Sequence, residues 1–239
     1  MRRTGASSPK LVPADVLISL NAGLDETVNL SETLAMDFST LWLAVIGEEC
    51  DGLAAGGVTG RMALAGLAMG ERWAEFRDHQ SDTVRGWACY ARVAVGGDLS
   101  GVLQDLKPFA ADPHFGVREW VWLAARGRVI GELDLAIEIL TNWSFDPDPN
   151  IRRFASEVTR PRGVWCAHIP ALKLEPWRGL PILEPLREDG SRYVQDSVAN
   201  WLNDAGKSQP EWVRGLVADW GEIGVADRIA KRAMRSLSE

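Results

Sequence analysis

The stretch DPHFGVR at residues 112–118 has two looser copies in the chain, SDTVR at 81–85 and DPNIR at 148–152. Each copy starts with an Asp or Ser that can cap a helix, and each ends with an aliphatic residue followed by Arg. The aliphatic residues Val84, Val117 and Ile151 are 33 and 34 positions apart. Such a period is typical of repeated helix pairs that stack on one another and leave a concave surface for a ligand.

Apolar residues recur at helical spacing nearly everywhere between these turns, and no run alternates apolar and polar residues as a strand would. The sequence therefore predicts an all-α protein, an α-solenoid of HEAT-like repeats with a concave basic groove. Weaker copies follow at Val194 and Ile229. We expect residues 1–80 to form an N-terminal helical region continuous with the solenoid, and residues 81–239 to form the HEAT-like repeats that carry the groove.

The composition is that of an ordinary globular protein, with 239 residues, 46% hydrophobic and 25% charged. No apolar stretch approaches the roughly 20 residues that span a bilayer, and no signal peptide pattern follows Met1, so we expect neither a transmembrane helix nor a signal peptide. We further expect a cytoplasmic protein that is a monomer. The three cysteines lie at wide spacings, which predicts reduced, buried thiols. The three histidines lack the spacing of a zinc site, so we expect neither a metal nor a cofactor.

The net charge of -7 argues against binding to nucleic acid, but the acidic residues are not evenly distributed along the chain. Residues 1–117 carry 9 basic and 15 acidic side chains, whereas residues 118–239 carry 17 and 18. Within the second half, the windows 150–165 and 227–235 are locally basic. A polyanion could therefore be held there despite the overall sign of the charge.

The segment 150–160 is predicted to be an amphipathic helix. Arg153, Glu157 and Arg160 share one face, and we expect either a solvated ladder of ion pairs or a site that grips phosphates. Arg162 adds a cation after the helix, and Trp165 could present an aromatic face to a base. The apolar residues expected in the core are Ile151, Phe154 and Val158, together with Val198 of a later helix.

The run RRFASEVTRPRGVW at 152–165 resembles the RRLASEGTRPRLPW segment of the HEAT-like alkylpurine DNA glycosylases, specifically their AlkC branch. The segments ILEPLRED at 182–189 and SVANWLND at 197–204, followed by Lys207, resemble two further signatures of that branch. The resemblance covers roughly residues 80–237. It implies an enzyme that excises cationic alkylated purines, chiefly N3-methyladenine, from double-stranded DNA.

The resemblance also implies that Glu157, Trp165 and Asp204 are the catalytic residues at the lesion, with Arg153 and Arg160 holding phosphates or orienting the carboxylates. An alkylated base is already a cationic leaving group, so a carboxylate that stabilises the oxocarbenium-like sugar is the main requirement. The family is understood to work without extruding the base into a pocket. Arg162 and Lys207 are expected to contact DNA.

His114 stands where the AlkC branch often has a Glu, Val158 replaces a Gly, and Gly163-Val164 replaces Leu-Pro. The change at His114 bears on turnover more than on DNA binding. A non-catalytic HEAT-repeat DNA-binding protein is therefore the alternative to a glycosylase. A HEAT scaffold for another protein is a third possibility.

The segment 225–237 is predicted to be a last helix with a basic face. A solvated face or phosphate contacts would both fit this pattern. The candidate DNA-binding residues on it are Arg228, Lys231, Arg232 and Arg235.

Overall fold

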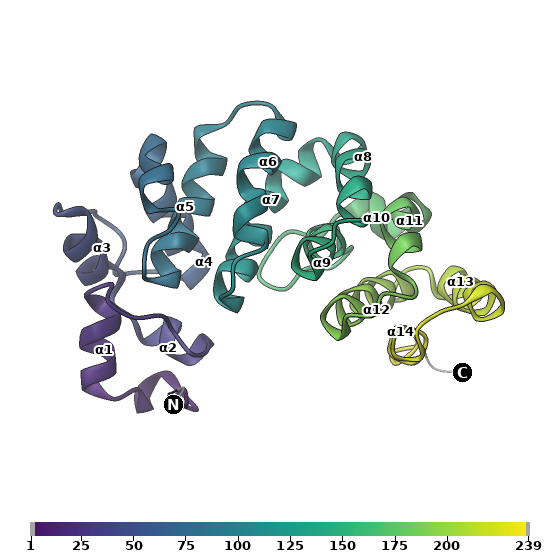
Figure 1. The fold of residues 1–239 in the computed structure, drawn as a ribbon, viewed down its shortest axis with the longest axis horizontal. Helices are drawn as coiled ribbons and strands as arrows, with labels where there is room; N and C mark the ends of the chain where they lie inside the picture. The colour runs from purple at the N-terminus through teal and green to yellow at the C-terminus, as the bar shows by residue number, and fades with distance from the viewer. Residues whose placement is uncertain (1–2, 238–239) are drawn as a thin grey trace. The chain divides into compact units, whose positions relative to one another are not determined.

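The computed structural model describes residues 3–237, which form α-helices and short 3-10 helices and include no β-strand in that range (Figure 1). The prediction of an all-α helical-repeat fold is confirmed. None of the described helices combines the length and the hydropathy that crossing a bilayer requires.

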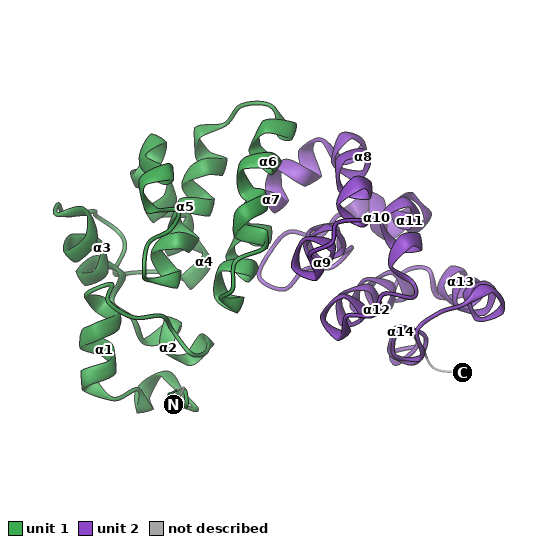
Figure 2. Ribbon diagram, in the orientation of Figure 1, with its two compact units in different colours: residues 1–124 green, residues 125–239 purple. Residues whose placement is uncertain are grey.

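The chain divides into two compact units, residues 1–124 and residues 125–239 (Figure 2). The α-helices that begin in the first unit are α1 (Ala14–Asn21), α2 (Leu30–Ala35), α3 (Phe38–Ile46), α4 (Val58–Met69), α5 (Asp82–Val95), α6 (Leu99–Ala110) and α7 (Phe115–Gly131). Those of the second unit are α8 (Leu133–Trp143), α9 (Pro149–Val158), α10 (Pro170–Leu174), α11 (Leu180–Leu183), α12 (Arg192–Gly206), α13 (Pro210–Ile223) and α14 (Asp227–Ala233). The 3-10 helices are η1 (Pro9–Leu11), η2 (Gly70–Phe76), η3 (Pro176–Gly179) and η4 (Glu184–Leu186).

Helices that follow one another in the sequence pack side by side within each unit (Figure 1). In the first unit α5 packs against both α4 and α6, and in the second α12 packs against α9, α13 and α14. The four residues predicted for the core, Ile151, Phe154, Val158 and Val198, are all buried, as expected. The assignment of residues 1–80 and of the groove to 81–239 stays a prediction.

Two predicted helices have different bounds in the structure. The helical spacing of apolar residues over 30–49 predicts one helix. The structure divides it, because Met36 is extended and the Asp37 carboxylate accepts hydrogen bonds from the backbone N–H groups of Ser39 and Thr40 at 2.9 and 3.1 Å. Asp37 therefore caps a new helix, α3, inside a continuous apolar pattern. The segment 225–237 is helical only from Asp227 to Ala233.

An arginine with the same contacts recurs at the start of α5, α7 and α9. Its Nη1 donates to the carbonyl oxygens of the residues six and five positions earlier, at 2.6–3.1 Å. These carbonyls belong to His79 and Gln80 for Arg85, to Asp112 and Pro113 for Arg118, and to Asp146 and Pro147 for Arg152. Each arginine thus holds the turn that precedes its own helix, and we call this contact the turn clamp.

Two of the turn clamps also reach the next repeat. Arg85 donates through Nε and Nη2 to the Asp112 carboxylate at 2.9 and 3.1 Å. Arg152 makes the same bidentate contact with Asp189 at 2.6 and 3.1 Å. In these two copies the Arg of the recurring motif therefore also fastens one repeat to the Asp that starts the following turn.

Candidate functional site

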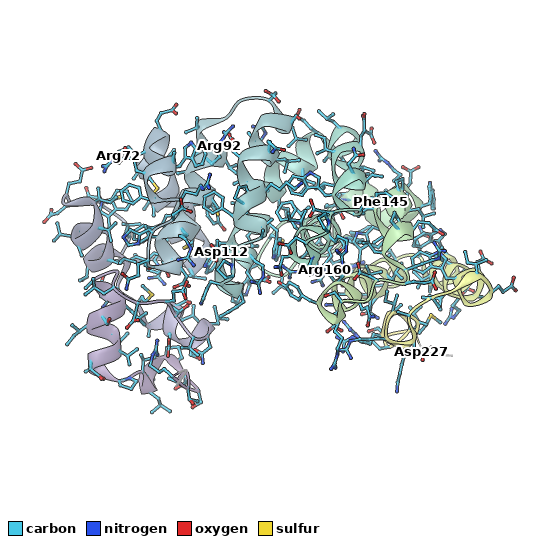
Figure 3. The ribbon with its side chains drawn as sticks, in the orientation of Figure 1. Arg72, Arg92, Asp112, Phe145, Arg160 and Asp227 are labelled. Carbon is cyan, nitrogen blue, oxygen red and sulfur yellow. The ribbon has the colours of Figure 1, made fainter. Side chains whose placement is uncertain are left out.

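The candidate site lies in the second unit, where the end of α9 meets α12. The helix α9 ends at Val158, and Arg160 and Pro161 follow, so the Arg160 side chain leaves the end of the helix toward α12 (Figure 3). Glu157 comes from the last turn of α9, and Asp204 from the last turn of α12. Two carboxylates that are 47 positions apart in the sequence are thereby joined through one guanidinium.

Arg160 bridges the two carboxylates. Its Nη1 donates to Glu157 Oε1 at 2.7 Å, while its Nε and Nη2 donate to Asp204 Oδ2 at 3.0 and 2.7 Å. The Ser197 hydroxyl donates to Glu157 Oε2 at 2.6 Å, and Arg153 Nη2 lies 3.5 Å from the same oxygen. The structure therefore brings the predicted residues Arg153, Glu157, Arg160 and Asp204 together in one cluster.

The charges in this cluster are buried. Glu157 is only 3% exposed, and Arg153 and Asp204 are buried as well. Burial alone would raise the pKa of the Glu157 carboxyl, but the positive charges of Arg153 and Arg160 and the hydrogen bonds from Ser197 and Arg160 outweigh it and lower that pKa. Glu157 is therefore an anion at neutral pH, and the interpretation of this helix face as a solvated ladder is wrong.

Arg153 is held from a second side by an aromatic ring. Its guanidinium lies 4.8 Å from the centroid of the Tyr193 ring, at the start of α12. A cation stacked on a ring and paired with a buried carboxylate keeps its position, so Arg153 serves to fix the charge of Glu157. With Arg153 buried, its predicted contact with a DNA phosphate stays a prediction.

Arg162 and Lys207 lie at the edge of the cluster. Arg162 donates to the Ser208 hydroxyl at 2.7 Å and to the backbone carbonyl of Asp204 at 3.3 Å. Lys207 donates to Asp204 Oδ1 at 3.0 Å, and its side chain is 45% exposed. Both cations are thus placed where a phosphate could compete for them.

Trp165 lies on the loop that follows Arg160 and is 55% exposed. Its φ of 61° puts it in the left-handed region, which is unusual for a bulky residue. Arg162, on the same loop, is tied to α12. The indole is therefore displayed at the surface close in sequence to the cluster, as the prediction of an aromatic contact requires.

The basic residues near the C-terminus are largely paired with α12. Arg228 donates to both oxygens of Asp196 at 2.7 and 2.9 Å, and Arg232 lies 3.1 Å from Oδ1 of the same carboxylate. Arg235 lies beyond the end of α14 and donates to the Asn200 side chain at 2.9 Å. Lys231 is exposed. The expected common helical face of four cations is therefore wrong for Arg235, and of the three cations that lie on α14, Lys231 is the exposed one.

His114 belongs to the first unit and takes part in a separate polar network. Its Nε2 lies 2.6 Å from the Thr27 carbonyl, and its Nδ1 accepts the Gly116 N–H at 3.1 Å, which assigns the ring proton to Nε2. Asp82 Oδ2 lies 3.4 Å from Nδ1. Burial raises the pKa of Asp82, although the hydrogen bonds from Thr27 oppose the shift. His114 also lines a pocket of about 590 Å³ in this unit.

Three contributors to the site were not identified in the sequence. They are Ser197, which binds Glu157, Tyr193, which covers Arg153, and Arg126, which holds the loop of Trp165. Ser197 lies in the SVANWLND segment, whose resemblance to the AlkC branch could have pointed to it. Arg126 lies in no recognised motif, so no sequence pattern gave a reason to select it. Among residues 3–237, no group of three or more His, Cys, Asp or Glu is arranged to hold a metal ion.

Comparison with known proteins shows which fold this is. The structure of Pseudomonas fluorescens alkylpurine DNA glycosylase AlkC bound to DNA containing an abasic site analog matches with a TM-score of 0.67 and 24% identity, covering 98% of this chain and 65% of that one. AlkD2 from Streptococcus mutans matches with a TM-score of 0.64 and 21% identity, covering 79% and 95%. This chain has the fold of AlkC and AlkD2.

Sequence comparison adds one relative. An uncharacterized protein, YhaZ of Bacillus subtilis (strain 168), is 43% identical over 115 residues, which are 48% of this chain and 32% of YhaZ. The matched part is thus about a third of the length of that relative. No protein-family model matches the chain.

Proposed function

We propose that this protein is a DNA glycosylase that removes cationic N3- or N7-alkylated purines, chiefly N3-methyladenine, from duplex DNA. The observation that carries the proposal is the buried cluster of Glu157, Arg160 and Asp204 beside a loop that displays Trp165. A fold shared with AlkC and AlkD2 supports it. The protein would act as a cytoplasmic monomer without a cofactor.

Asp204 is the carboxylate best placed to reach the sugar. Both oxygens of Glu157 are held by Arg160, Ser197 and Arg153, whereas Asp204 Oδ1 is held by the half-exposed Lys207. Because the lysine is flexible and reaches solvent, its ammonium can move aside. Asp204 would then face the sugar, and Glu157 would keep Arg160 and thereby Asp204 in position.

The reaction needs little more than this charge. Cleavage of the N-glycosidic bond returns its electron pair to the cationic purine, which leaves as a neutral base, so no acid has to protonate it. The positive charge that develops on the sugar would be stabilised by the Asp204 carboxylate, and a water molecule then adds to the anomeric carbon and loses one proton to solvent. The Trp165 ring would favour the cationic base by roughly 0.5–2 kcal/mol.

Duplex DNA would be held by the cations at the edge of the cluster and beyond it. Arg162 and Lys207 lie next to Asp204, and the exposed Lys231 lies on α14, which packs against the same helix α12. These positions would place phosphates on both sides of the carboxylate. Arg153 and Arg160 would act on the carboxylates, since both guanidinium groups are occupied by them.

The deciding experiment is an abasic-site assay on duplexes that contain N3-methyladenine or N7-methylguanine. We expect release of the alkylated base and an alkali-labile site, with neutral lesions unprocessed because the site offers no acid for the leaving group. A wild-type protein that releases no base from either duplex would contradict the proposal.

A non-catalytic DNA-binding protein is the second candidate, and one observation favours it. His114 replaces an acidic residue expected from the AlkC branch, and its ring is committed to Thr27 and Gly116 inside the first unit. Equal binding of modified and unmodified duplexes without excision would assign this function instead.

A further inference from the structure

The loop from Pro161 to Ile169 has a tip that costs free energy to maintain. Val164 and Trp165 are both exposed, and Trp165 is the one residue other than glycine in the described chain with a positive φ. A bulky side chain in this region of φ is strained and persists only where the surroundings impose it. The source of that constraint therefore has to be found around the loop.

Arg126 supplies the constraint from within. This residue lies in the part of α7 that belongs to the second unit and is only 2% exposed. Its Nη1, Nη2 and Nε donate to the carbonyl oxygens of Val158, Arg160 and Ala167 at 2.8, 2.6 and 2.8 Å. One rigid guanidinium thus holds the main chain on both sides of the tip.

Two further contacts restrict the loop from Pro161 to Ile169. The Ile169 N–H donates to the Pro161 carbonyl at 3.0 Å, which joins the ends of the loop. At Gly163 there is no room for a side chain, because a Cβ would overlap the Cys166 Sγ and lie 3.3 Å from the Arg126 guanidinium carbon. The loop is therefore packed directly onto Arg126, and its geometry leaves little freedom at the tip.

We propose that Arg126 is a positioning residue that holds Trp165 as a preformed aromatic surface for a planar, cationic base. The burial of Arg126 supports this role, because a guanidinium held by main-chain carbonyls cannot also serve as a surface contact for DNA. The choice of ligand rests on the proposed function, whereas the fixed geometry of the loop does not.

Fluorine NMR of protein labelled with 5-fluorotryptophan tests the geometry directly. The chain has 11 Trp residues, and a Trp165→Phe variant assigns the signal of interest. In Arg126→Lys, which keeps the charge but loses the fork of donors, we expect the Trp165 signal to broaden or move while the others stay. The matched control is Arg152→Lys, since Arg152 also holds two carbonyls but does not touch this loop.

A second pair of variants tests the packing of the loop at Gly163. Gly163→Ala should displace the Trp165 signal, and adding Cys166→Ala, which removes the overlapping sulfur, should restore it. An unmoved Trp165 signal in folded Arg126→Lys would overturn the proposal. So would an Arg126→Lys protein that fails to fold, because Arg126 would then be a residue of general stability.

Excision kinetics test the link to the ligand. We expect Arg126→Lys to slow release of N3-methyladenine about tenfold, the equivalent of one lost contact between a ring and a cation. In a Trp165→Ala background the same change should have no further effect, because both act through one ring. Additive losses would overturn the proposal. If the wild type excises no base, the proposed function fails, while the fluorine signals still decide the role of Arg126.

Discussion

At the scale of single residues, the two carboxylates of the cluster differ in what surrounds their oxygens. Glu157 is enclosed by three donors, whereas one oxygen of Asp204 meets only Lys207. We therefore expect Asp204→Asn to lower single-turnover release of N3-methyladenine by roughly 100- to 1,000-fold, which is the usual loss for one electrostatic partner of a transition state. Duplex binding should change far less. A rate for Asp204→Asn within a few fold of the wild type would remove Asp204 from the chemistry.

Glu157 should also make stability depend on pH. Since its pKa is lower in the folded protein, the unfolded chain takes up the proton first as the pH falls. The stability that the Glu157 anion contributes is thus fully present above the ordinary Glu pKa of about 4.3 and is lost below it. Urea unfolding should show wild type more stable than Glu157→Gln between pH 6 and 8, with the difference shrinking below pH 4. A difference that does not vary with pH would contradict this assignment.

The buried stripe of Ile151, Phe154 and Val158 could be predicted because helical periodicity is a local property of the sequence. The partner of Glu157 could not, since Ser197 lies 40 positions away and any hydroxyl looks alike in a sequence. The prediction of three buried cysteines was right only for Cys89; Cys50 and Cys166 are partly exposed.

At the scale of elements, the turn clamps explain why the repeat could be predicted from the sequence. A clamp needs one Arg at a fixed place after a turn, so its signature survives in the sequence as the recurring aliphatic residue and Arg. The break between α2 and α3 depends instead on Asp37, whose cap interrupts an unbroken apolar pattern. Capping by one side chain outweighed periodicity there, and the pattern alone contained no sign of it.

The clamp that joins Arg152 to Asp189 should contribute strongly to stability. Asp189 is almost fully buried at this contact, and loss of one partner leaves a buried charge unpaired. We expect Asp189→Asn to lower the free energy of unfolding by roughly 2–4 kcal/mol. The control is Glu211→Gln, which breaks an exposed pair with Arg214 and should cost within about 1 kcal/mol. If urea unfolding shows equal losses of unfolding free energy in the two variants, the buried clamp contributes no more to stability than an exposed ion pair.

At the scale of the whole molecule, a net charge of -7 has to coexist with the proposed binding to a polyanion. Many of the cationic side chains form ion pairs within the protein, as Arg228 and Arg232 do with Asp196. Only cations that reach solvent can exchange a counterion for a phosphate. The choice of Lys231 as a DNA contact follows from this distinction, which the sequence alone could not make.

Salt dependence of duplex binding tests this choice. If Lys231 contacts one phosphate, Lys231→Ala should lower the magnitude of the slope of log K against log salt concentration by about 0.9. The matched control is Lys10→Ala, since Lys10 is also exposed but lies in the first unit. If Lys231→Ala leaves the slope unchanged, Lys231 does not contact a phosphate.

The turn clamps also bear on how such a chain can evolve. The interval from Ile151 to Val194 is 43 residues, longer than the two before it, yet Arg152 keeps both its turn carbonyls and its bond to Asp189. The extra length falls between residues 159 and 188, the segment that includes the Trp165 loop. Insertions and deletions can therefore accumulate there while the flanking repeats stay fastened, so the segment proposed to meet the ligand can diversify without loss of the fold.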